Sequence, residues 1–155
     1  MFNQNELQAY LEKWQKILRL RDWDIKLELV TKEWHKTGDV KIDQCGKAAI
    51  VLINNVNPKC ANIEAVIIHE LLHIKLYGMD QMIEELLQCV YGNDTNEPKH
   101  AFAYSQFMGL LEVTTEDLAK GYVELGADDK TVTGLCKVQN EADVEWGKTQ
   151  TRVKQ

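Results

Sequence analysis

Residues 62–78 read NIEAVIIHELLHIKLYG, the most apolar part of the chain and the expected centre of its fold. Apolar residues fill most of its positions, and its length suits a helix better than a strand, so it predicts a strongly apolar helix. Asn62 is expected to cap the start of this helix. Gly78 is expected to end it just after Tyr77.

The segments on either side predict an α+β domain. Alternating apolar and polar residues over 22–30 are typical of a half-buried strand, and two more strands are expected to meet at a turn near Cys45-Gly46. Beyond Gly78, Asp80 is expected to cap a short helix. Pro98 suits the first turn of a longer helix, which could break and begin again at Thr114 or Thr115. The expected order is a helix, a small three-stranded mixed sheet and then helices: 5–20, 22–30, 38–44, 47–54, 62–77, 81–90 and 98–126.

Composition narrows the function classes. The chain has 155 residues, of which 45% are hydrophobic, and this suits one globular domain, expected over residues 1–126. Residues 127–155 read as a polar, weakly ordered tail. The formal net charge of -6 would repel nucleic acids and anionic membranes, so neither is an expected partner.

Cysteine usage and the N-terminus favour a cytoplasmic protein. The start of the chain lacks a basic segment followed by an apolar run, so no signal peptide is expected. The four cysteines form no CxxC pair, which argues against a zinc ribbon, and they are expected to be reduced thiols: Cys45, Cys60, Cys89 and Cys136.

His69-Glu70-Leu71-Leu72-His73 is an HExxH motif on the predicted apolar helix. Residues four apart share a helix face, so both imidazoles can face one ion, and imidazole nitrogen is a good ligand for Zn²⁺. Glu70 is expected to flank the attacking water as a general base and not to bind the metal. Without partners, burying these polar groups in so apolar a helix would be costly, which favours a metal site.

A third protein ligand is needed, because catalytic zinc usually has three such ligands and a water. No downstream histidine continues the motif; His35 and His100 are expected to be surface residues. The third ligand is therefore expected to be a carboxylate on a later helix. The residues alone leave several candidates open: Glu84, Glu85, Glu97, Glu112 and Glu116. Glu116 also fits a capping box begun by Thr114, which would make it a poorer ligand.

The motif resembles that of a known group of enzymes. AVIIHELLHIKLYGMDQMIEELL, between the strand AAIVLINN and the segment FAYSQFMGLLEVTTEDLAKGYVEL, is similar to the small phage-type zinc metallopeptidases of the minimal gluzincin kind. A more distant similarity links it to the SprT-like proteins, although this chain lacks their zinc-ribbon tail. The likeness covers about residues 23–125. It implies a zincin-like fold for the domain expected over residues 1–126, an edge strand that holds an extended peptide, and Glu112 as the third ligand.

These observations predict a zinc metalloendopeptidase. His69, His73 and Glu112 would bind Zn²⁺, with Glu116, Glu85 and Glu84 as alternative third ligands. The peptide or protein substrate would lie antiparallel along the strand 47–54. Two alternatives stay open: a zincin-fold binding or regulatory protein without turnover, and a hydrolase of a non-peptide amide or ester.

Overall fold

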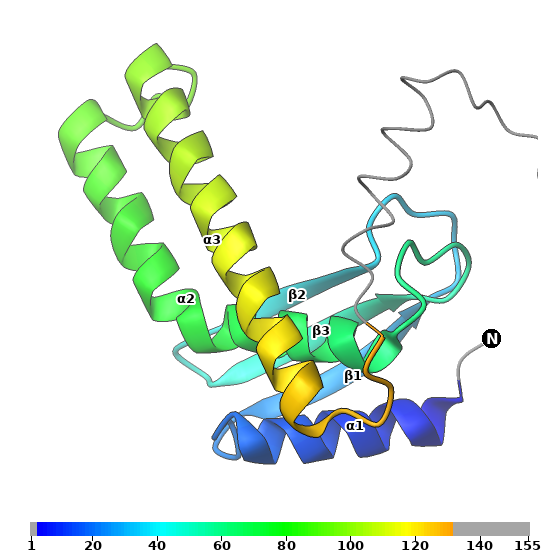
Figure 1. Cartoon of the computed structure of the whole chain (residues 1–155). Helices are drawn as coiled ribbons and strands as arrows, with labels where there is room; N and C mark the ends of the chain where they lie inside the picture. Colours follow the sequence, from blue (N-terminus) through cyan, green and yellow to red (C-terminus); the bar gives the residue numbers. More distant parts are fainter. Residues whose placement is uncertain (1–2, 132–155) are drawn as a thin grey trace, which may run out of the picture.

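The computed structural model describes residues 3–131, which form three helices and three strands (Figure 1). The elements are α1 (Gln4–Ile17), β1 (Asp24–Val30), β2 (Gly38–Asp43), β3 (Ala48–Asn54), α2 (Ile63–Tyr91) and α3 (Pro98–Gly126). The predicted α+β class and three-stranded mixed sheet are confirmed. The predicted tail at 127–155, and with it Cys136, lies outside the described residues from position 132 onward.

The sheet has the order β1-β3-β2, with β1 parallel and β2 antiparallel to β3. β3 is therefore the central strand, with Leu27 of β1 and Val40 of β2 both aligned with its Val51. The prediction that a substrate adds to the strand 47–54 is wrong, because neighbouring strands already pair with both of its edges. The most apolar strand takes the middle position, where most of its surface is covered.

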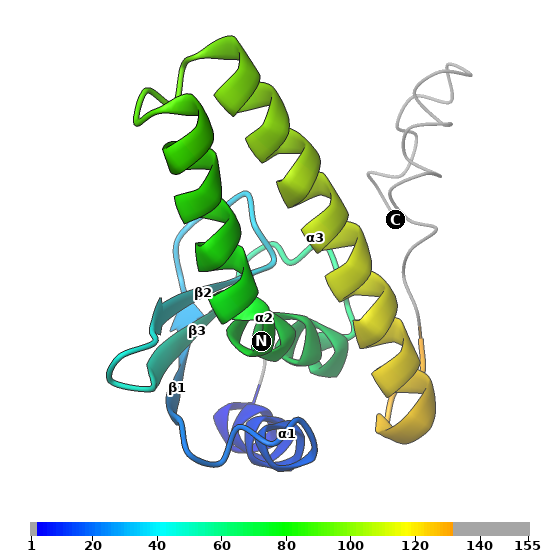
Figure 2. The ribbon, with the colours of Figure 1, turned by 90° about the vertical axis from the view of Figure 1, so that its left-hand side faces the viewer.

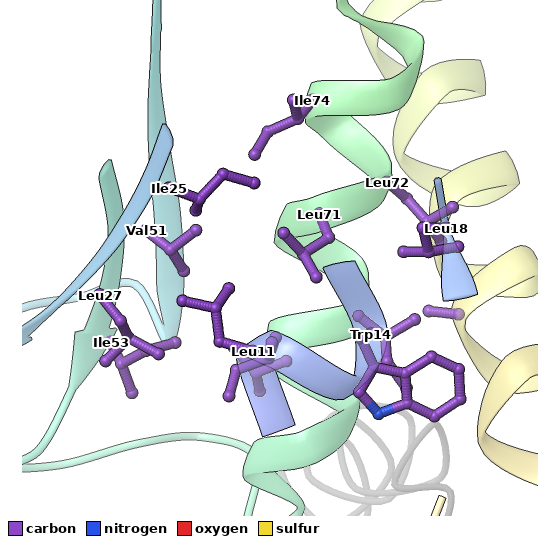
Figure 3. Close-up of a cluster of buried hydrophobic side chains, with 14 of the residues drawn as sticks. Leu11, Trp14, Leu18, Ile25, Leu27, Val51, Ile53, Leu71, Leu72 and Ile74 are labelled. Carbon is purple, nitrogen blue, oxygen red and sulfur yellow. The ribbon is translucent and has the colours of Figure 1, made fainter. Parts of the chain in front are cut away.

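One face of the sheet carries the core. Side chains alternate along the strands, so those of β1 and β3 that point toward the helices meet α1 and the first part of α2. Figures 2 and 3 show α1 and α2 covering this face, with Leu11 and Leu71 among the side chains packed toward it. This arrangement holds the first part of α2 against the sheet.

α2 runs without interruption through Gly78, so the expected break there is wrong and Asp80 does not cap a separate helix. A glycine inside a helix costs about 1 kcal/mol relative to alanine. Here the helix passes close to the turn between β2 and β3, and a Cβ at Gly78 would lie 3.1 Å from Nε2 of Gln44. The helix ends instead before Gly92, whose φ of 86° is in the left-handed region.

α2 and α3 form a long antiparallel pair that extends beyond the sheet. Figures 1 and 2 show α2 lying along the sheet in its first part and then rising beside α3. α3 is also continuous, so the expected restart at Thr114 or Thr115 is wrong. Thr115 is instead buried inside the helix, and a residue in that position cannot act as an N-terminal cap.

A buried carboxylate ties three segments together at the start of α2. Glu64, 1% exposed, accepts hydrogen bonds from Lys13 Nζ at 2.8 Å, Trp14 Nε1 at 2.7 Å and the backbone N of Asp128 at 2.8 Å. The expected cap Asn62 accepts from the backbone N of Ala65 at 3.0 Å, which confirms its role. α1, α2 and the segment that follows α3 are therefore joined at one point.

Candidate metal site

The two motif histidines face each other from adjacent turns of α2. Nε2 of His69 lies 3.0 Å from Nε2 of His73, and the ring centroids are 4.8 Å apart. Their side chains are 19% and 18% exposed. Two imidazole nitrogens that point at the same place can both offer lone pairs only to a shared cation, because otherwise one of them must carry a proton.

α3 brings a carboxylate to the same point. Glu112 Oε2 lies 3.5 Å from Nε2 of His69, and Glu112 Oε1 lies 3.4 Å from Nε2 of His73. The three residues each offer a ligand atom within 4.8 Å of the others. Within residues 3–131 they are the only His, Cys, Asp and Glu side chains that converge in a group of three or more that could hold a metal ion.

Glu116, one turn further along α3, takes a different position from Glu112. Its Oε2 lies 3.3 Å from Nδ1 of His69, and its Oε1 lies 3.4 Å from Nζ of Lys120. It therefore contacts the back of the imidazole, and it is not part of the convergent group. A carboxylate in this place holds the ring and makes its other nitrogen a better ligand.

The remaining carboxylates lie elsewhere. Glu84 Oε1 is 3.5 Å from the hydroxyl of Tyr104, Glu85 is exposed, and Glu97 caps α3 by accepting from the backbone N of His100 at 2.8 Å. None of the three belongs to the convergent group.

The other two histidines also stay out of the convergent group. His35 is exposed, as expected. The expectation that His100 is a surface residue is wrong, because it is only 5% exposed at the start of α3.

Glu70 lies beside the histidines and points toward β2. It is 6% exposed, and burial raises its pKa to about 7, although the nearby His69 works in the opposite direction. A Cβ placed at Gly38, the first residue of β2, would overlap its Oε1. The side chain of Glu70 is thus confined between its own helix and the start of an edge strand.

The electrostatics of the group favour a positive charge at its centre. Burial works to lower the pKa of His69, but the contact with Glu112 and the charges of Glu70 and Glu116 outweigh it and raise this pKa. Burial, together with the charge of His69, lowers the pKa of His73. The hydrogen bond from His69 lowers the pKa of Glu112. The residues present therefore suit a bound cation, with two nitrogen donors and an ionised carboxylate around it.

An open hollow of about 340 Å³ lies beside the group on the α3 side. His69 and Glu112 line it together with Val113, Glu116, Asp117 and Lys120. Small molecules can therefore reach His69 and Glu112 from solvent on this side.

The helices within residues 3–131 are not candidates for crossing a membrane, since none combines the necessary length and hydropathy.

No protein-family model, curated protein or solved structure matches the chain. The indication of function therefore comes from the side chains of this chain: a His-x3-His pair on α2 and a glutamate on α3 that together could hold a metal ion.

Proposed function

We propose that this protein is a zinc-dependent hydrolase of peptide bonds. The observation that carries the proposal is the convergence of His69, His73 and Glu112, with Glu70 buried beside them and outside the ligand group. α2 would supply two of the three ligands and the acid–base group, and α3 would supply the third ligand.

The ligand set supports zinc. Two imidazole nitrogens and one carboxylate oxygen are the protein ligands of a common type of catalytic zinc site, with a fourth position left for water. His69, His73 and Glu112 would hold the ion. When bound, zinc supplies Lewis acidity, which polarises a carbonyl and makes water a stronger acid.

Glu70 supplies the proton transfers. In the metal-free chain burial raises the pKa of Glu70 to about 7. A zinc ion bound beside it would favour the ionised carboxylate, which can accept a proton from water and return it. Glu70 takes a proton from the attacking water as the new C–O bond forms. It then delivers this proton to the amide nitrogen as the C–N bond breaks, so the leaving group departs as an amine.

The substrate would lie along β2. This strand occupies one edge of the sheet, and its outer edge pairs with no other strand among the described residues. Its first residue, Gly38, lies against Glu70, so a chain added to this edge passes the acid–base group. Backbone hydrogen bonds to a free strand edge bind extended peptides with little dependence on sequence.

The test uses the purified chain, stripped of metal and reloaded with zinc, on a mixture of unrelated peptides analysed by mass spectrometry. We expect cleavage that needs zinc and that falls by about 10²–10⁴-fold in Glu70→Gln, the range for removal of a general base. Glu85→Gln is the matched control, because Glu85 is an exposed glutamate on the same helix.

Two outcomes would contradict the proposal. Zinc binding without cleavage of any peptide would indicate a binding or regulatory protein. Hydrolysis of small amides or esters, with peptides left intact, would indicate a different substrate class.

A further inference from the structure

Gly38 marks the closest approach of the sheet to the proposed acid–base group. A Cβ at this position would overlap Oε1 of Glu70, and it would lie 3.0 Å from Cδ of Glu70 and 2.8 Å from Cγ1 of Val66. Separations below 3.0 Å require a neighbour to move. The carboxylate of Glu70 therefore occupies the space that any other residue at position 38 would fill.

Backbone conformation does not explain the glycine. Among the described glycines only Gly92 has a φ in the left-handed region, and Gly38 pairs with Ile53 as an ordinary strand residue. Another residue could adopt the backbone angles of position 38. The need for glycine at position 38 is one of space.

We propose that Gly38 is a positioning residue for Glu70, whose missing side chain lets the carboxylate stand beside the two histidines. This inference rests on the proposed hydrolytic function. It adds a residue outside the HExxH motif that determines where the acid–base group lies.

Hydrogen bonds fix the start of β2 more firmly than any contact fixes the carboxylate of Glu70. Asn54 donates from its backbone N to Thr37 O at 2.9 Å and from Nδ2 to Lys36 O at 2.7 Å, just before β2 begins. Asn54 is itself fully buried at the end of the central strand. The carboxyl group of Glu70, at the end of a flexible side chain, is therefore the part that moves when a methyl group is added at position 38.

The experiment compares Gly38→Ala with Gly46→Ala in the zinc-loaded protein. Gly46 is a matched control, because its added Cβ would also press on a carboxylate, 2.6 Å from Oδ2 of Asp43, in the turn between β2 and β3. We expect Gly38→Ala to lower kcat by about 10²-fold, as misplacement of a reacting group by roughly 1 Å does. Zinc affinity should stay unchanged, and Gly46→Ala should keep the wild-type kcat.

The same substitution made in the Glu70→Ala variant tests whether Gly38 affects kcat through Glu70. In Glu70→Ala the carboxylate is gone and only the close contact with Cγ1 of Val66 remains, so adding Gly38→Ala should lower the residual kcat by less than threefold or so. A wild-type kcat in Gly38→Ala would overturn the proposal. So would the same fold-loss in both backgrounds, which would point to damage of the strand edge or of the metal ligands.

The wild type, Gly38→Ala, Glu70→Ala and the variant with both substitutions remain informative if the wild type cleaves nothing. In that case the proposed function fails, and denaturant unfolding of the metal-free forms still tests the contact. Gly38→Ala should shift the unfolding midpoint less in the Glu70→Ala background than in the wild type. Equal shifts in both would show that Glu70 does not occupy the space beside position 38.

Discussion

The carboxylate of Glu116 lies 3.3 Å from Nδ1 of His69, on the opposite edge of the ring from the nitrogen that faces His73. Glu112, one helical turn earlier on α3, contacts Nε2 of the same ring at 3.5 Å. Two glutamates four residues apart thus contact the two nitrogens of one histidine. In the proposed zinc site we expect different tasks for them: Glu112 as a ligand, and Glu116 as the group that holds the ring.

Glutamine substitutions should separate these two tasks. We expect Glu112→Gln to weaken zinc binding most, because a neutral amide replaces an ionised oxygen ligand. Glu116→Gln should weaken it by about 10–100-fold, the usual effect of removing the partner of a ligating histidine. Zinc affinities from competition with a chelator would measure both, with Glu85→Gln as the control. A larger loss in Glu116→Gln than in Glu112→Gln would reverse the assignment.

Zinc stoichiometry tests the histidine pair directly. We expect about one Zn²⁺ per chain in the wild type and almost none in His73→Ala after dialysis, because two remaining protein ligands hold zinc far more weakly. Elemental analysis gives the measurement. His35→Ala serves as the control, because His35 is exposed and lies outside the convergent group. Zinc retained at full stoichiometry in His73→Ala would rule out the site as described.

The raised pKa of Glu70 should appear in the stability of the metal-free protein. Its pKa is about 7 in the fold against an ordinary value of 4.5, so between these pH values the folded state keeps a proton that the unfolded state has released. The contribution of Glu70 to the free energy of unfolding therefore falls as pH rises through this window, by about 3 kcal/mol at most.

Glu70→Gln removes this titration. The variant should gain stability relative to the wild type as the pH rises from 4 to 8, as measured by denaturant unfolding with a chelator present. A stability difference that stays constant across this range would show that burial does not perturb Glu70.

The buried Glu64 should be a major contributor to stability away from the metal site. Glu64→Gln turns one acceptor oxygen into a donor beside Trp14 Nε1, Lys13 and the backbone N of Asp128. We expect a loss of about 1–3 kcal/mol in the free energy of unfolding, the usual cost of an unsatisfied buried polar group. Glu28→Gln, on the exposed face of β1, should change it by less than about 0.5 kcal/mol. Equal effects of the two substitutions would contradict a special role for Glu64.

Part of the candidate metal site can be predicted from the spacing of residues along the sequence. The facing pair of His69 and His73 follows from the pitch of one helix, because residues four apart share a face whatever lies around them. The strand β1 follows from alternation of apolar and polar residues, and β3 follows from a short continuous apolar run. Asn62 reads as a cap from its position alone. These features depend on interactions within a few residues.

Other features arise only when distant segments meet. β3 is the central strand because β1 pairs with the edge of β3 that β2 leaves free. α2 continues through Gly78, at a point where it lies close to Gln44. The apolar periodicity of a single segment predicts neither the central position of β3 nor the continuity of α2 through Gly78. An isolated glycine therefore reads as a helix end, and a strand reads equally well as edge or centre.

Local sequence predicts the HExxH helix and names the residue types that can complete a metal group, whereas the packing of the helices selects which of these residues meet. Glu112 and Glu116 both lie on α3, and the packing of that helix on α2 places the first beside both histidines and the second behind one of them. Gly38 reaches Glu70 in the same way, through the packing of β2 on α2. Local hydrogen bonding sets the geometry within a helix, whereas burial of side chains from segments far apart sets the geometry between elements.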